Sequence, residues 1–157
     1  MVLTGGCYCG SLAYEVTPPL GPVVNCHCAF CRRIHGAAFT TAAVMPAEAF
    51  VWTPSSACPS TFETPLGNVR HFCAACASPI WNYAPYIETG VLIVGSLAQE
   101  FQPAPWLHVN TESMSPSFAI ADALPRFSQW PDEATLRALC DQHPGAWVPE
   151  PLFQRSG

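Results

Sequence analysis

Charged side chains are scarce in this sequence of 157 residues. Only 11% of the residues are Asp, Glu, Lys or Arg, and the formal net charge is −5. A soluble domain usually has about 25% of such residues, so the surface must be unusually neutral. Phosphate binding needs a basic face, which this composition does not supply. We therefore expect no nucleic acid among the partners of this protein.

Long apolar runs are also lacking. The longest apolar stretches, residues 37–45 and 91–94, are far shorter than the roughly 20 residues that cross a bilayer. Residues 1–6 contain neither a basic segment nor an apolar run, so no secretory signal is predicted. These absences predict a cytoplasmic protein without membrane contact.

Long helical segments are the third absence. The 17 prolines and 10 glycines are spread along the chain and favour short strands joined by turns. Residues 60–64 and 69–73 predict a hairpin, and residues 32–36 predict one helical turn that ends at Gly36. Residues 132–143 predict a helix, with Asp132 as its N-cap. The fold class is therefore mainly β, with short antiparallel strands and one short C-terminal helix.

Cysteine, in contrast, is abundant. In a reducing compartment, nine cysteines with short spacings indicate metal ligands before disulfides. Structural zinc sites use four ligands, whereas reactive sites leave one position to water or substrate. The simplest partition has two parts. The four-cysteine cluster is Cys7, Cys9, Cys73 and Cys76, and the three-cysteine cluster is Cys26, Cys28 and Cys31. We expect a closed structural site in the first and an open site in the second, each with Zn²⁺.

Two arginines follow the third cysteine of the three-cysteine cluster. Three thiolates on Zn²⁺ leave a charge near −1, which Arg32 or Arg33 could neutralise. Either side chain could instead clamp a substrate carboxylate, and the plain alternative is a solvated turn. We count Arg32 with the three cysteines as a candidate catalytic residue.

Several other residues have open roles. His27 lies between two ligands and is expected to support the site or to pack in the core, with direct ligation as the alternative. His108 could donate a proton or bind backbone, and the same alternatives apply to His71. Cys58 is a possible fourth ligand or a loop residue, and Cys140 is expected to be an inert buried thiol.

Four sequence motifs together resemble one known family. They are Gly6-Cys7-x-Cys9-Gly10, Cys26-His27-Cys28-x-x-Cys31-Arg32, Arg70-x-Phe72-Cys73-x-x-Cys76, and His108 followed by Leu124-Pro125-x-Phe127. This pattern, over residues 4–131, is similar to the glutathione-dependent formaldehyde-activating enzyme family, which also includes centromere protein V.

The resemblance implies an Mss4-like, tent-shaped zinc-binding β domain over residues 1–131, followed by a C-terminal helix and tail at residues 132–157. It implies a structural zinc in the four-cysteine cluster and a catalytic zinc in the three-cysteine cluster. It also implies a carbon–sulfur lyase that joins glutathione and formaldehyde as S-(hydroxymethyl)glutathione. The family usually has Gly after the last cysteine pair, where this chain has Ala77, and if that position needs a positive φ the knuckle must be built differently here.

Two other interpretations of the cysteines stay open. In the first, a fourth protein ligand closes the three-cysteine cluster and the protein is a zinc-stabilised binding module without chemistry. In the second, Cys26, Cys28 and Cys31 are metal-free redox thiols. The coordination of the second metal distinguishes these alternatives from an enzyme.

Overall fold

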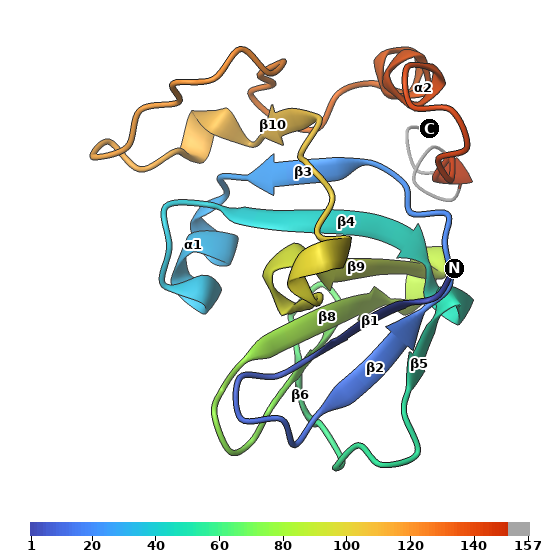
Figure 1. The fold of residues 1–157 in the computed structure, drawn as a ribbon. Helices are drawn as coiled ribbons and strands as arrows, with labels where there is room; N and C mark the ends of the chain where they lie inside the picture. Colours follow the sequence, from blue (N-terminus) through green and yellow to red (C-terminus); the bar gives the residue numbers. More distant parts are fainter. Residues whose placement is uncertain (151–157) are drawn as a thin grey trace.

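The computed structural model describes residues 1–150, which form ten short strands, two α-helices and five 3₁₀ turns (Figure 1). The strands are β1 (Leu3–Gly6), β2 (Ala13–Val16), β3 (Val23–Cys26), β4 (Thr40–Pro46), β5 (Phe50–Trp52), β6 (Ser60–Glu63), β7 (Val69–Phe72), β8 (Pro79–Ala84), β9 (Thr89–Ile93) and β10 (Leu107–Val109). The helices are α1 (Ala29–His35) and α2 (Glu133–Asp141). The 3₁₀ turns are η1 (Ala47–Ala49), η2 (Pro85–Ile87), η3 (Val94–Ser96), η4 (Gln99–Phe101) and η5 (Thr111–Ser113). The predicted mainly β fold is confirmed.

The strands form two sheets. The small sheet has the order β1-β2-β5, and the large sheet has the order β10-β3-β4-β9-β8-β7-β6. Neighbouring strands are antiparallel, except that β10 runs parallel to β3. The predicted hairpin is β6–β7, whose turn has Gly67 at φ 81, a conformation that glycine adopts without a Cβ clash.

The core lies between the two sheets. An aromatic stack crosses it from β2 to β8: the ring centroids of Tyr14 and Phe50 are 4.8 Å apart, and those of Phe50 and Trp81 are 4.3 Å apart. Gly5 lets β1 approach this stack, because a Cβ there would lie 2.3 Å from the Tyr14 hydroxyl. The stack therefore joins the small sheet to the β8–β9 half of the large sheet.

One end of the large sheet collects both groups of cysteines. β3 ends there at Cys26, which is opposite Thr40 at the start of β4, and β9 ends there one strand further along. β8 begins there at Pro79, opposite Phe72, and Cys73 follows directly. In Figure 1, β3, β9 and β10 end on the left, where β4 and β8 begin. Four strand spacings separate β3 from β7, a distance of about 19 Å.

The two helices cover different parts of the sheet. α1 extends the predicted turn into seven residues, and Gly36 ends it at φ 58 as expected. α2 confirms the predicted C-terminal helix, because the Asp132 carboxylate accepts from the Thr135 N–H at 2.8 Å. Leu139 of α2 packs on the β3–β10 part of the large sheet. Residues 151–157 of the predicted tail lie outside the described residues, and the boundary at residue 131 stays a prediction.

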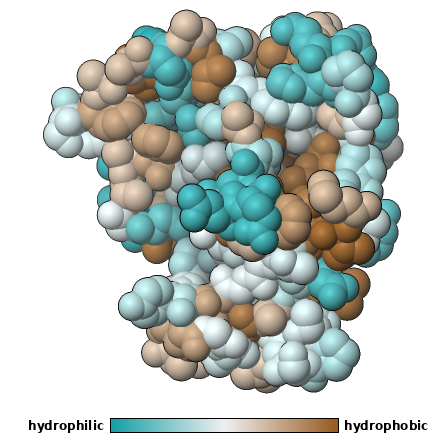
Figure 2. Space-filling model, viewed as in Figure 1, coloured by the Kyte–Doolittle hydropathy of each residue, from teal (hydrophilic) through white to brown (hydrophobic). Residues whose placement is uncertain are grey.

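The surface agrees with the low charge content. In Figure 2 hydrophilic colour gathers over α2 and over η4, while much of the remaining face is pale or brown. Within residues 1–150, neither helix has the length and apolarity needed to cross a membrane.

We expect the aromatic stack to carry a large part of the stability. Phe50→Ala should lower the free energy of unfolding by about 3–5 kcal/mol, because it removes the ring between two others. Urea unfolding with metal supplied measures this change. Val51, the exposed neighbour on β5, provides the control: Val51→Ala should cost less than about 0.5 kcal/mol. Equal losses in the two variants would contradict the role given to the stack.

Candidate metal centres

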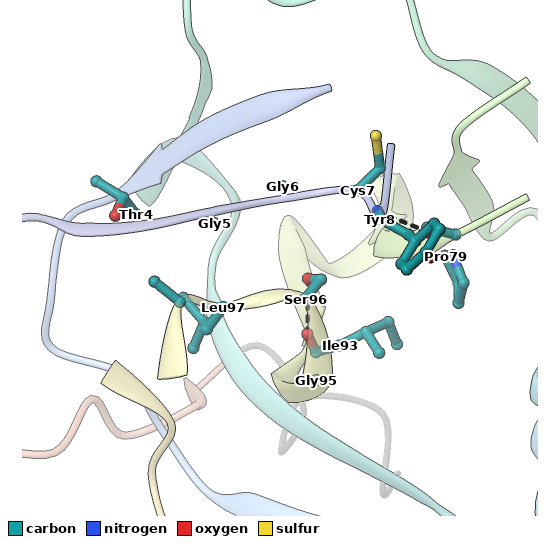
Figure 3. A pocket seen from close by; sticks show the side chains of 12 residues that line it. Thr4, Gly5, Gly6, Cys7, Tyr8, Pro79, Ile93, Gly95, Ser96 and Leu97 are labelled. Carbon is teal, nitrogen blue, oxygen red and sulfur yellow. Dashed lines mark hydrogen bonds between the residues drawn. The ribbon is translucent and has the colours of Figure 1, made fainter. Parts of the chain in front are cut away.

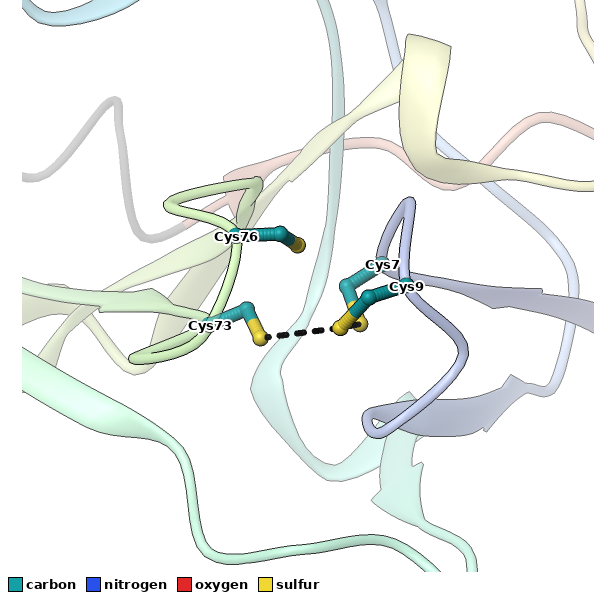
Figure 4. Close-up of side chains that lie close together, drawn as sticks. All are labelled: Cys7, Cys9, Cys73 and Cys76. Carbon is teal, nitrogen blue, oxygen red and sulfur yellow. Dashed lines mark hydrogen bonds between the residues drawn. The ribbon is translucent and has the colours of Figure 1, made fainter.

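Two turns bring the four-cysteine cluster together. Cys7 and Cys9 lie in the turn after β1, and Cys73 and Cys76 lie in the turn after β7 (Figure 4). All four sulfur atoms are within 4.8 Å of one another, with 3.5 Å from Cys7 to Cys9 and 3.7 Å from Cys9 to Cys73. Four thiolates around one Zn²⁺ at 2.3 Å would be about 3.8 Å apart, so the arrangement fits a tetrahedral metal site.

Hydrogen-bond donors surround these sulfurs. The Leu12 N–H donates to Cys7 Sγ at 3.1 Å, and the Ser11 hydroxyl lies 3.1 Å from Cys9 Sγ. Burial raises the pKa of Cys7, but the donors from Leu12 and Ser11 outweigh it and lower the pKa to about 7. The Ser78 hydroxyl lowers the pKa of Cys76 to about 5. Thiols with such pKa values become metal-binding thiolates readily.

The turn after β7 contains Ala77, at the position where the family usually has glycine. Ala77 has φ 60, so this position does adopt the positive φ that would favour glycine. Its N–H still donates to the Cys73 carbonyl at 2.8 Å, and the Cys73 N–H donates to the Ser78 carbonyl at 3.0 Å. The knuckle therefore keeps a hydrogen-bonded turn and holds a strained alanine in it.

The three-cysteine cluster is built where β3 passes into α1. Cys26 ends β3, Cys28 is the N-cap of α1, and Cys31 lies in its first turn. The Cys31 N–H donates to Cys28 Sγ at 3.2 Å, and the three sulfurs are within 4.8 Å of one another. Among residues 1–150, no His, Asp, Glu or further Cys joins this group as a fourth ligand.

The pKa shifts of the three thiols indicate that the cluster binds a cation when all three are ionised. The nearby sulfur of Cys26 lowers the pKa of Cys28. Hydrogen bonding with Cys28 raises the pKa of Cys26, and the sulfur of Cys26 raises the pKa of Cys31. Three thiolates at such distances repel one another, so they ionise together only with a positive charge between them. The donor set therefore fits a metal ion.

A distant segment holds Cys26 in place. The side-chain amide of Asn110 donates to Cys26 Sγ at 3.3 Å, and the His27 N–H donates to the Val109 carbonyl at 3.0 Å. Asn110 has φ 57, a left-handed conformation that Asn tolerates better than most residues. Nothing in the sequence pattern indicated this contact.

His27 lies outside the metal group, in a chain of hydrogen bonds that runs from two buried histidines to an exposed carboxylate. Its Nε2 lies 2.8 Å from His108 Nδ1, and His108 Nε2 lies 3.1 Å from the Asp122 carboxylate. A carboxylate only accepts, so His108 donates from Nε2 and accepts at Nδ1 from His27. The remaining His27 Nδ1 is a buried acceptor without a partner in the described part of the chain. The sequence indicated both histidines but not Asp122.

The two arginines in the last turn of α1 differ in exposure. Arg32 is half-buried, and it donates from Nε to the His27 carbonyl at 3.3 Å and from its guanidinium to the Ser113 carbonyl at 3.0 Å. Arg33 is exposed. Both border a cavity of about 290 Å³. Arg32 thus joins the ligand loop to the segment that follows β10.

The remaining candidates lie outside both clusters. Cys58 is exposed in a loop, Cys140 is buried in α2, and neither joins a metal-binding group. His71 stacks on Trp81 with ring centroids 5.0 Å apart. Burial lowers the pKa of His71, as expected for a neutral core ring.

A larger cavity of about 660 Å³ lies beside the four-cysteine cluster, with Cys7 in its lining. It is lined by residues within 4–8, 78–79 and 93–98, none of them charged. Figure 3 shows the main chain of β1 on one side and that of Gly95 to Leu97 on the other. A Cβ on Gly95 would meet nothing within 4 Å. The cavity offers space beside the four-cysteine cluster but no charge to hold an anion.

Comparison with known proteins agrees with this geometry. The model of the family described as glutathione-dependent formaldehyde-activating enzyme matches residues 2–113. A protein of Halomonas elongata, provisionally named as such an enzyme, is 26% identical over 91 residues, which are 54% of this chain and 58% of that protein. The chain thus spans little more than half the length of this relative.

A solved structure shares the fold. The crystal structure of a Rhodobacter sphaeroides protein matches with a TM-score of 0.53 and 20% identity. The match covers 66% of this chain and 98% of that one.

We expect the two clusters to respond differently to loss of a ligand. Cys73→Ser should unfold the domain, because metal binding at a closed site is folding energy. Cys28→Ser should leave the fold intact and lower the metal content by one ion per chain. Circular dichroism and metal analysis after zinc loading measure both effects, with Cys58→Ser as the exposed control. Equal damage from the first two variants would mean that the ligands are divided wrongly.

The strained knuckle gives a stabilising substitution. Ala77→Gly should raise the free energy of unfolding by about 1 kcal/mol, because glycine adopts the left-handed conformation without a Cβ clash. Ala75→Gly, in the same turn but without a positive φ, should lower it by about 0.5–1 kcal/mol. Denaturant unfolding of the zinc-loaded variants tests the opposite signs, and a loss of stability in both would contradict strain at Ala77.

Proposed function

Since the chain belongs to the glutathione-dependent formaldehyde-activating enzyme family, we propose that it is a carbon–sulfur lyase acting on a thiol–aldehyde adduct. Its simplest reaction is the formation or breakdown of S-(hydroxymethyl)glutathione from glutathione and formaldehyde. The observation that carries this proposal is the three-cysteine cluster, which has three sulfurs in reach of one ion and no fourth ligand within residues 1–150. Its need for reduced thiols agrees with the cytoplasmic location predicted from the sequence.

We assign Zn²⁺ to both clusters. Cys7, Cys9, Cys73 and Cys76 would hold a structural ion, and Cys26, Cys28 and Cys31 would hold the second. All-thiolate ligands suit zinc or iron, and the chain has no spacing typical of an iron–sulfur cluster. At an open thiolate site, zinc lowers the pKa of an incoming thiol and polarises a carbonyl oxygen.

The reaction itself needs no oxidant or reductant. The thiol sulfur adds to the aldehyde carbon, the carbon–oxygen double bond becomes a single bond, and the thiol proton ends on the new hydroxyl. Breakdown reverses each of these changes. The protein therefore has to bring two small molecules together and manage one proton.

Residues around the three-cysteine cluster would hold it ready for this step. Asn110 fixes Cys26 through its side-chain amide, and the His27–His108–Asp122 chain fixes the orientation of the loop that carries the three cysteines. Arg32 adds a positive charge beside the thiolates, where it offsets the excess negative charge of the site. We propose positioning roles for Asn110, His108 and Asp122 and an electrostatic role for Arg32.

Exchange spectroscopy tests the activity directly. Glutathione and formaldehyde exchange with their adduct at a rate that NMR measures. The zinc-loaded protein should raise this rate above the uncatalysed one. Cys28→Ser should return the rate to that background, because it removes a ligand of the open site, and Cys58→Ser should not change it. A wild-type rate equal to background, with two zinc ions bound per chain, would exclude the enzyme. X-ray absorption showing four protein ligands at the second zinc would then favour the binding module.

A further inference from the structure

A small cavity beside the three-cysteine cluster has the chemistry of an anion site. We call it the arginine cavity: it has a volume of about 290 Å³ and is lined by Arg32, Arg33, residues 36–38, Ser115 and Ser117. It lies between the end of α1 and the loop that follows η5. No acidic side chain borders it, although the whole chain has a net charge of −5.

No carboxylate pairs with Arg32 within the described chain. Its two hydrogen bonds go to main-chain carbonyls, and no ion pair to Arg32 or Arg33 occurs among residues 1–150. Arg137 on α2, by comparison, pairs with both Glu133 and Glu150. A half-buried arginine is usually paired, because desolvation of its charge is costly. The two carbonyls hold the Arg32 guanidinium in one orientation and leave three of its five N–H donors for a ligand.

The opposite wall adds a hydroxyl donor. The side-chain oxygens of Ser115 and Ser117 are 2.9 Å apart, so one hydroxyl donates to the other. The accepting hydroxyl keeps its own proton for a further hydrogen bond. The cavity therefore presents one anchored guanidinium, a second guanidinium on the exposed Arg33, and one hydroxyl. Planar guanidinium groups fit a carboxylate through paired hydrogen bonds.

The position of the cavity sets the length of the ligand. Arg33 follows the N-cap Cys28 by five residues, so its Cα lies about 7.5 Å further along the axis of α1. Two extended residues span about 7 Å. Building on the proposed function, we propose that the arginine cavity binds the carboxylate of a short peptide thiol whose sulfur lies at the three-cysteine cluster. The protein then selects acidic thiols over neutral ones of the same size.

Binding of a thiol-free ligand tests this site apart from the chemistry. S-methylglutathione keeps both carboxylates of glutathione but cannot add to an aldehyde, and its diethyl ester lacks the negative charges. Calorimetry on the zinc-loaded protein should show that the acid binds at least roughly ten-fold more tightly than the ester. Arg33→Gln should lower the affinity for the acid by roughly ten-fold and leave the affinity for the ester unchanged. Ser117→Ala should lower the affinity for the acid by a smaller factor.

Two controls separate a bound carboxylate from a general charge effect. Arg137→Gln makes the same change in net charge on α2 and should bind the acid like the wild type. Arg33→Lys keeps the charge but not the planar fork, and it should restore only part of the affinity. Inorganic phosphate should compete weakly with the acid, and phosphate binding tighter than that of S-methylglutathione would overturn the assignment to a carboxylate.

The outcomes distinguish this proposal from the proposed function. Equal affinity for acid and ester, an unchanged affinity in Arg33→Gln, or no binding of the acid at millimolar concentration would overturn the carboxylate site, whatever the exchange assay shows. Binding that depends on Arg33, together with exchange at the background rate, would support the site and remove the lyase activity. With both results positive, Arg33→Gln should raise KM for glutathione and leave kcat near the wild-type value.

Discussion

The mutual repulsion of closely placed thiolates is the constraint on which this structure depends. Four sulfurs meet in one group and three in another, and the sulfurs of each group lie within 4.8 Å of one another. Without a cation, such groups keep most of their protons, and no metal–sulfur bonds hold together the turns that carry them. The four-cysteine cluster also joins β1 of the small sheet to β7 of the large sheet. It therefore closes, at one end, the same interface that the Tyr14–Phe50–Trp81 stack fills in the middle.

The order of the strands places both cysteine clusters at one end of the large sheet. β3, β9 and β7 all end there, so both clusters lie at that edge, and the uncharged cavity lies beside the four-cysteine cluster. β10 adds itself in parallel to β3, which is the only parallel pair in the described chain. Because of this pairing, His108 contacts His27 across 81 residues of sequence, and Asn110 contacts Cys26 across 84. The loop that carries the three cysteines is thus held in place by β10, a strand that supplies no metal ligand.

The charges of the site divide between its two sides. On the side of the loop that carries the cysteines, the two histidines each donate one N–H along a chain that ends at the Asp122 carboxylate. On the side of α1, two arginines without acidic partners face the cavity next to the metal group. If the three-cysteine cluster holds an open metal site as proposed, the positive cavity beside it suits a substrate that brings its own negative charge.

The sequence alone determined the local features of this protein. The scattered prolines and glycines predicted short strands, and the Asp132 cap predicted α2, because these signals act over a few residues. The cysteine spacings also indicated which neighbouring sulfurs lie together, since each set lies within one tight turn or one turn of helix, while the joining of Cys7 and Cys9 to Cys73 and Cys76 was a hypothesis about pairing. The structure brings the seven cysteines into those two groups, while the roles given to them stay predictions.

Tertiary structure decided everything that depends on irregular segments meeting across long separations. Asn110, Ser113, Ser115, Ser117 and Asp122 lie in a stretch without periodicity, where sequence carries no signal of which side chain will face the cysteines. Only the parallel docking of β10 on β3 brings that stretch to α1. The conformation of Ala77 is also set by its surroundings. The turn that holds Cys73 and Cys76 imposes a left-handed conformation, which the Cβ of alanine disfavours.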